Sequence, residues 1–107
     1  MAENKTPPDW YTGNINLFNR PKYKNKDGSI STVYSMSFYD SKTDKEVLVP
    51  TIIRREGQPV KLSEKEAIQR YYVTGKHLGR FDTPEQADIA ARRIHRQQNK
   101  LLKRKQP

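Results

Sequence analysis

Two histidines are the first candidates for chemistry in this chain of 107 residues, because it has no cysteine. His77 lies in a connector between two glycines, and His95 lies in a predicted helix. Neither stands in a pattern that supplies a nucleophile, a base and an orienting group. A metal site would need both histidines to meet carboxylates such as Asp82 or Glu85, and these residues lack a recognised ligand spacing. We therefore predict no catalytic residue, no metal and no cofactor.

Two further patterns could belong to an enzyme. Glu64 and Glu66 resemble the paired carboxylates of glycoside cleavage, but they lie at a helix start, where capping and the helix dipole explain them. Gly75 and Gly79 enclose three residues without the preceding strand or the following Lys-Ser/Thr of a phosphate loop. A helix stop and a tight connector account for both glycines. The sequence therefore predicts a protein that is not an enzyme.

Basic residues gather at the C-terminal end. The formal net charge is +9, and the segment after Asp88 holds seven Lys/Arg residues and no acid. At about 100° per residue, one arc of a helix carries Ala87, Ala90, Ala91, Ile94, Gln98 and Leu101. The opposite arc carries Arg92, Arg93, Arg96, Lys100, Lys103 and Arg104.

The basic arc has two interpretations. As a functional surface it contacts phosphates or an acidic groove, and phosphate binding would then depend on salt. As a solvated face it needs no partner, because cations are favourable near a helix C-terminus. The sign of the charge alone does not distinguish nucleic acid, an anionic membrane and an acidic protein.

Aromatic residues near lysines suggest a second surface. Single-stranded nucleic acid is gripped by rings interleaved with cations. The predicted sheet offers Tyr23, Tyr34, Phe38 and Tyr39 beside Lys22, Lys24 and Lys26. Core packing explains most of these rings equally well, because only alternate positions of a strand face outward. Tyr39 and one other ring would then be free to stack.

The predicted sheet occupies residues 14–53. A first extended segment covers 14–23, and a turn ending at Gly28 precedes the best strand, in which Ile30, Thr32, Tyr34, Met36 and Phe38 alternate. A third strand covers 47–53 and is interrupted at Pro50, which should lie at an edge or a bulge. Residues 54–59 form a loop around Gly57. We expect an antiparallel sheet with one buried face.

Two capped helices follow the sheet. In the first, at 63–74, Ser63 and Glu66 form a capping box, and Gly75 ends the helix. In the second, at 83–104, Thr83 is the cap and Pro84 occupies the first turn. The predicted fold class is α+β: a small antiparallel sheet of about three strands followed by two C-terminal helices packed on one face.

Composition divides the chain into three parts. Residues 1–11 read as a flexible N-terminal arm anchored at Trp10 and Tyr11, residues 12–98 as one α+β domain, and residues 99–107 as a basic helical extension. The longest apolar run, 47–49, is far too short to span a bilayer. The first residues lack the apolar core of a secretory signal, so we expect the protein to stay where it is made until lysis or assembly moves it.

Several short pieces, taken in order, resemble a module that recurs in tailed-bacteriophage proteins, alone or within large virion-associated polypeptides. The pieces are GNINL at 13–17, RP at 20–21, NKDGSISTV at 25–33, SMSF at 35–38, EVLVPT at 46–51, EAI at 66–68 and TGKHLG at 74–79. The resemblance covers residues 12–98. It implies a virion context and carries over no catalytic residue. The basic end from Arg92 departs from the mixed charge of that module.

A narrower similarity involves residues 77–91. The run HLGRFDTPEQA followed by Ala90-Ala91 is similar to the last strand and helix of AP2-type DNA-binding domains, which read the major groove with a three-stranded sheet. Here a capped helix precedes the run in place of a strand, so this similarity implies the weaker hypothesis.

These observations predict a non-catalytic, virion-associated structural or accessory protein. It would be made in the host bacterial cytoplasm and bind other phage virion proteins through its sheet and its basic C-terminal helix. The alternative is a phage nucleic-acid-binding protein, either an AP2-like DNA binder or a host-takeover regulator. An enzyme is the least favoured class.

Overall fold

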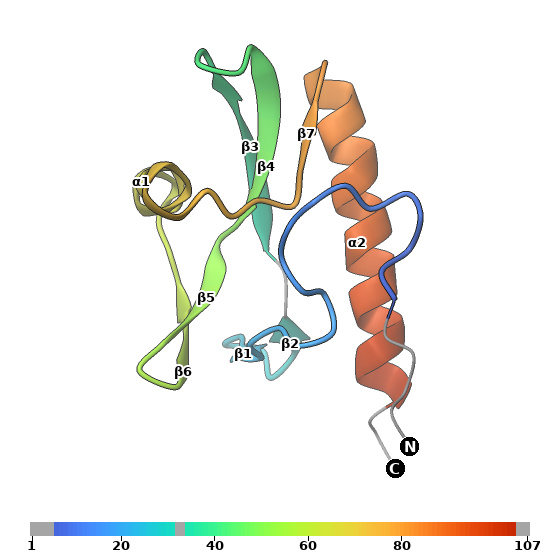
Figure 1. Cartoon of the computed structure of the whole chain (residues 1–107). Helices are drawn as coiled ribbons and strands as arrows, with labels where there is room; N and C mark the ends of the chain where they lie inside the picture. Colours follow the sequence, from blue (N-terminus) through green and yellow to red (C-terminus); the bar gives the residue numbers. More distant parts are fainter. Residues whose placement is uncertain (1–5, 32–33, 105–107) are drawn as a thin grey trace.

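A computed structural model describes residues 6–31 and 34–104, with only the backbone of Lys103 and Arg104. The fold is α+β, as predicted (Figure 1). The described part contains seven strands and two helices. Their bounds in chain order are β1 Tyr23–Lys24, β2 Ile30–Ser31, β3 Ser35–Asp40, β4 Lys45–Pro50, β5 Ile52–Arg55, β6 Gln58–Lys61, α1 Glu64–Thr74, β7 Gly79–Phe81 and α2 Pro84–Arg104.

The central sheet has the strand order β3-β4-β7, and both pairs are antiparallel. β3 and β4 pair along their whole length, from Ser35 opposite Pro50 to Asp40 opposite Lys45. β7 pairs with β4 only between Glu46 and Leu48. At Pro50, β4 therefore has one neighbour, which suits a residue without a backbone donor.

Both faces of this sheet are covered, so the prediction that the two helices share one face is wrong. Val47 and Val49 of β4 pack with Ala67 and Tyr71 of α1. Leu48 between them packs with Ile94 of α2 in a separate cluster. Successive strand residues point to opposite faces, so the two helices lie on opposite sides of the sheet, as Figure 1 shows. The sheet is not one-sided.

The remaining strands form two short hairpins, and the prediction of a single three-stranded sheet is wrong here as well. β1 pairs with β2, and β5 pairs with β6, each in its own two-stranded sheet. The predicted strand at 47–53 is thus split between two sheets, and the predicted loop at 54–59 is the hairpin between β5 and β6. Residues 14–22 contain no strand, and Thr32 and Val33 lie outside the described residues.

The helices follow their predicted bounds because their signals are local. The Ser63 hydroxyl accepts from the Glu66 amide, the Glu66 carboxylate accepts from the Ser63 amide, and Gly75 ends α1 in the left-handed conformation with φ 71°. At α2, the Thr83 hydroxyl accepts from the Gln86 amide. The Gln86 side chain accepts from the amide of Asp82, whereas in a capping box it would accept from the amide of the cap residue Thr83.

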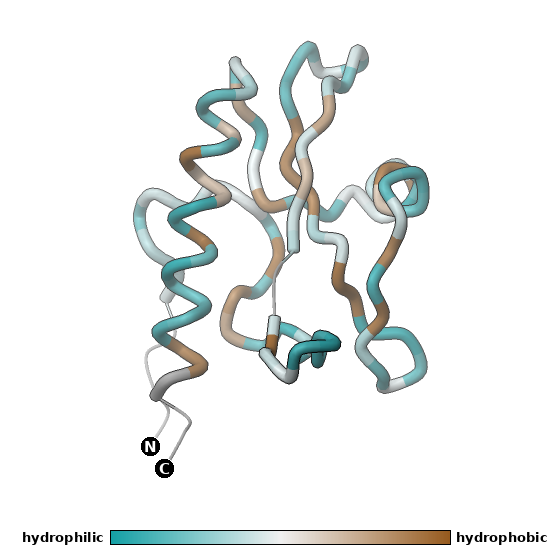
Figure 2. The backbone as a smooth tube through the Cα atoms, turned by 180° about the vertical axis from the view of Figure 1, so that it is seen from behind, coloured by the Kyte–Doolittle hydropathy of each residue, from teal (hydrophilic) through white to brown (hydrophobic). Residues whose placement is uncertain are grey.

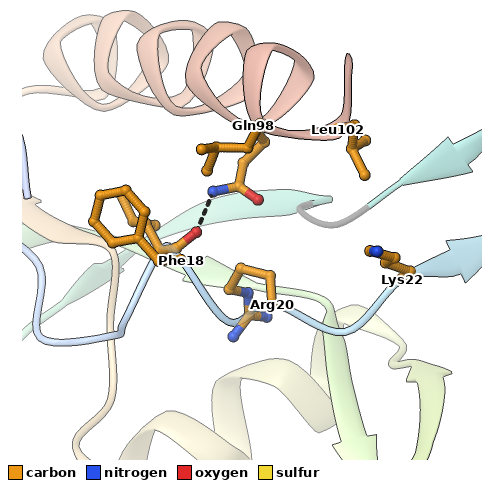
Figure 3. Close-up of a pocket in the computed structure, with 7 residues that line it drawn as sticks. Phe18, Arg20, Lys22, Gln98 and Leu102 are labelled. Atoms are coloured by element: carbon orange, nitrogen blue, oxygen red, sulfur yellow. Dashed lines mark hydrogen bonds between the residues drawn. The ribbon is translucent and has the colours of Figure 1, made fainter. Parts of the chain in front are cut away.

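The segment before β1 covers the α2 side of the sheet. Leu17 is buried with Leu48, Leu78 and Ile94, and Trp10 packs against the same cluster. Gln98 of α2 donates to the Leu17 carbonyl at 2.7 Å, as Figure 3 shows. These contacts tie the segment and the middle of α2 into one core layer.

Candidate basic interface

The candidate site lies on α2, whose two sides have different roles. Ala87 and Ile94 are fully buried and Gln98 is 4% exposed, which confirms the predicted packing arc. Ala90, Ala91 and Leu101 are half-buried. Figure 2 shows hydrophilic residues along much of α2, interrupted at intervals by apolar ones. The apolar stripe of α2 therefore packs on the core, and its polar stripe faces the solvent.

Four of the six predicted contact residues are exposed on that outer side, and we call them the basic row: Arg92, Arg93, Arg96 and Lys100. The backbone of Lys103 and Arg104 continues α2, but their side chains lie outside the described part of the structure. Among the described residues, the one ion pair joins Lys45 to Asp82, away from this row. The acidic residues of α2, Glu85 and Asp88, lie near its N-terminus, where the helix dipole favours them.

Two open hollows flank the basic row. The first, which we call the Trp10 hollow, has a volume of about 390 Å³ and is lined by Pro8, Trp10, Arg93, Arg96, Gln97 and Lys100. The second, the Tyr34 hollow, has a volume of about 380 Å³ and is lined by Tyr34, Ser35, Ala91, Arg92, His95 and Arg96. Arg96 lines both, so the row is a continuous surface with an aromatic ring on either side.

The two rings are held differently. Trp10 is half-buried and meets the Tyr11 ring edge-on, with centroids 6.3 Å apart. Tyr34 donates to the Asn25 side chain at 3.2 Å, and the Lys61 ammonium lies 4.4 Å from its ring centroid. One face of Tyr34 is thus already occupied by a cation. The sequence singled out Trp10 only as an anchor, because nothing local indicates that it meets α2.

The histidines occupy unlike surroundings. His77 is 6% exposed and its ring meets the Tyr71 ring edge-on at 6.3 Å. Burial lowers the pKa of His77, and the nearby Arg80 guanidinium lowers it further. His95 is exposed on α2 within the Tyr34 hollow. No group of three possible metal ligands occurs among the residues that the structure describes.

The carboxylates near the two helix starts have structural roles. Hydrogen bonds from the backbone and side chain of Ser63 lower the pKa of Glu66. Asp82 pairs with Lys45, and Glu85 lies in the first turn of α2. None of these contacts assembles a pair of carboxylates around a cavity.

A polar and aromatic cluster joins α1 to the sheet. Tyr72 donates to the buried Asp40 at 2.8 Å, and Arg80 donates to the Tyr71 hydroxyl at 2.8 and 3.0 Å. Burial raises the pKa of Asp40, but hydrogen bonds from Tyr72, Thr43 and the Lys42 amide outweigh it, and the pKa is lower than usual. Phe38 meets both tyrosine rings edge-on. Phe38 is half-buried in this cluster, while Tyr39 is 60% exposed.

Residues of the segments 13–17 and 74–79 meet in space, at a contact we call the Asn14 clasp. The Asn14 side chain accepts from the His77 amide at 2.8 Å and donates to the Gly75 carbonyl at 3.0 Å. The Asn14 amide donates to the His77 carbonyl at 3.1 Å. A Cβ on Gly13 would come within 2.7 Å of that same carbonyl. These motif residues therefore hold the fold together.

Comparisons of the chain with protein-family models, curated proteins and solved structures gave no match. Among the described residues, no helix has the length and apolar character that a membrane span requires.

Proposed function

We propose that this chain is a non-catalytic accessory protein of a tailed-bacteriophage virion that binds an acidic surface of another virion protein through α2. It is made in the host bacterial cytoplasm and incorporated into the particle. The ordered motif pieces that resemble the phage module supply the context. The sheet is not assigned a binding role of its own, because α1 and α2 cover its faces.

One observation carries this proposal: four exposed cations on α2 each line a hollow that contains an aromatic ring, and none of them has a carboxylate partner among the described residues. Trp and Arg are the residues most enriched among those that dominate the energy of protein interfaces. Trp10 is already packed on the core, so it loses little side-chain freedom on binding. A partner that supplies carboxylates would complete a surface of this composition.

The test is a charge reversal with a matched control. The variant Arg92→Glu, Arg93→Glu, Arg96→Glu reverses the row, while Lys24→Glu, Lys26→Glu, Lys76→Glu makes the same change of net charge at exposed positions elsewhere. We expect mass spectrometry of purified particles to find the control at the wild-type level and the α2 variant reduced at least tenfold. Circular dichroism checks that both are folded. Absence of the wild-type chain from particles would contradict the virion role, and equal incorporation of the two variants would contradict the role of α2.

A second candidate function is nucleic-acid binding by the same row. The Trp10 hollow favours it, since a ring beside Arg93, Arg96 and Lys100 is the combination that grips single strands. The AP2-like mode is less favoured. The chain order β3, β4, β7, α2 does give a three-stranded antiparallel sheet followed by a helix. However, α2 covers one face of that sheet and α1 packs on the other.

Salt dependence separates the two functions. If four cations contact phosphates, the logarithm of the binding constant for single-stranded DNA should fall with log salt at a slope of about −3. Fluorescence anisotropy in NaCl from about 50 to about 300 mM, roughly the range over which phosphate contacts are lost, measures this slope. A flat response, or binding unchanged by the triple arginine reversal, would exclude nucleic acid as the ligand of α2.

A further inference from the structure

A second cluster of cations lies away from the basic row, around Arg20. Arg20 belongs to the irregular segment before β1, and Figure 3 shows its side chain pointing away from α2. Its guanidinium donates to the Ile52 carbonyl at 2.5 Å. Its Nε is buried and has no hydrogen-bond partner in the described structure. A half-buried arginine thus keeps an unused donor.

The neighbouring hollow, which we call the Arg20 hollow, is lined by three cationic residues and by no acidic residue. It has a volume of about 340 Å³, and its lining residues are Asn19, Arg20, Pro21, Lys22, Arg54, Gly57 and Pro59. Glu56 adjoins the hollow in sequence, but it is exposed and does not line it. Arg54 is exposed on β5, where it pairs with Pro59 of β6. Three cationic residues, two from the segment before β1 and one from β5, therefore line the same hollow.

The cations repel one another in the folded protein. The pKa of Arg20 is lowered to about 10, mainly by burial, with smaller contributions from Arg70 and Arg54 that Tyr11 partly opposes. Burial also lowers the pKa of Arg70, with a contribution from Arg55. Buried arginines are normally paired with a carboxylate, because an unpaired buried charge is costly. Here the described residues provide no such carboxylate to Arg20.

We propose that this hollow binds a phosphate group, held by Arg20, Lys22 and Arg54. A guanidinium offers donors in a planar fork that matches phosphate oxygens. A site with several cations also binds a doubly charged phosphate better than it binds a singly charged carboxylate. The volume exceeds that of one phosphate ion, so the carrier of a phosphate monoester also fits. This proposal is independent of the basic row, because α2 contributes no residue to the hollow.

Thermal unfolding in the presence of anions tests the proposal on the intact chain. At constant ionic strength maintained with NaCl, we expect inorganic phosphate to raise Tm by several degrees, and the rise should grow with the logarithm of phosphate concentration. Adenosine 5′-monophosphate is the second probe. A larger rise with the nucleotide means that the carrier contributes, and an equal rise means that the phosphate group alone is recognised. No rise with either probe beyond that in NaCl would overturn the proposal.

Arg54→Gln and Arg55→Gln form a matched pair on one strand. Both residues are exposed, but Arg54 lines the Arg20 hollow whereas Arg55 lines a different one with Arg70 and Glu66. We expect Arg54→Gln to remove at least three quarters of the phosphate-dependent rise without lowering Tm in NaCl, since it relieves repulsion on Arg20. Arg55→Gln should retain the rise. A full phosphate response in Arg54→Gln would overturn the proposed site, whatever α2 binds.

Discussion

At the scale of single residues, the most unusual titratable group is His77. Its ring is buried against Tyr71, its Nδ1 has no partner in the described structure, and Arg80 lies nearby. Burial and the arginine both oppose the charged imidazolium, so the pKa is below the ordinary value of 6.5. His77 is thus a structural residue whose protonation would work against the fold.

This environment predicts acid sensitivity. As pH falls below about 6.5, the unfolded chain takes up the His77 proton before the folded chain does, so the free energy of unfolding falls with pH, by at most about 1.4 kcal/mol per pH unit. Above that pH the group contributes no slope. Urea unfolding at pH 7.5 and 5.5 measures the effect. We expect the loss to be smaller in His77→Gln than in the wild type. Equal losses in the wild type and His77→Gln would show that other groups are responsible.

At the scale of elements, α1 depends on its N-terminal capping box. The Ser63 hydroxyl and the Glu66 carboxylate satisfy two amides that the helix itself leaves without partners. α1 in turn supplies Ala67 and Tyr71 to one side of the core. Weakening the cap should therefore destabilise the whole domain and not only the helix end.

We expect Ser63→Ala to lower the free energy of unfolding by about 1 kcal/mol. The matched control is Ser41→Ala, in the exposed turn between β3 and β4, which should change it by less than about 0.5 kcal/mol. Urea unfolding followed by circular dichroism gives both values. If the two variants have the same midpoint, the capping box contributes nothing measurable.

The predictability of the elements follows the range of the interactions that define them. Both helices could be predicted, because Ser63, Thr83 and Gly75 act within a few residues of the backbone groups that they satisfy. The faces they cover could not, because the alternation of Val47, Leu48 and Val49 is equally apolar on both sides. The split of the third strand is an exception, because its partner β6 begins only three residues after β5 ends, in the segment for which the sequence predicts a loop around Gly57.

The same division applies to the candidate sites. Helical periodicity alone placed Arg92, Arg93, Arg96 and Lys100 on one outer side, and the structure agrees. Trp10 joins that surface only through the path of the preceding segment. The Arg20 hollow combines residues more than 30 positions apart, and no local spacing connects them. Charge counts indicate that cations are abundant but not where they converge.

At the scale of the whole molecule, the sheet separates two core layers with different compositions. The α1 side contains Tyr71, Tyr72 and the buried carboxylate of Asp40, and the segment before β1 packs on the α2 side. The basic row lies outside the second layer, and the Arg20 hollow lies between that segment and the β5–β6 hairpin. The two proposed binding surfaces therefore occupy different parts of the molecule and can be altered separately.

The Asn14 clasp has a consequence for biosynthesis. Its side-chain bonds join positions 61 and 63 residues apart, so no nascent chain can close them before residues 75–77 have left the ribosome. Contacts between distant residues carry the entropy cost of closing the intervening loop and form late. Until then Trp10 and Leu17 lack the surfaces that bury them. Translation of the second half of the chain is thus the interval in which its apolar N-terminal segment is exposed to chaperones and to aggregation.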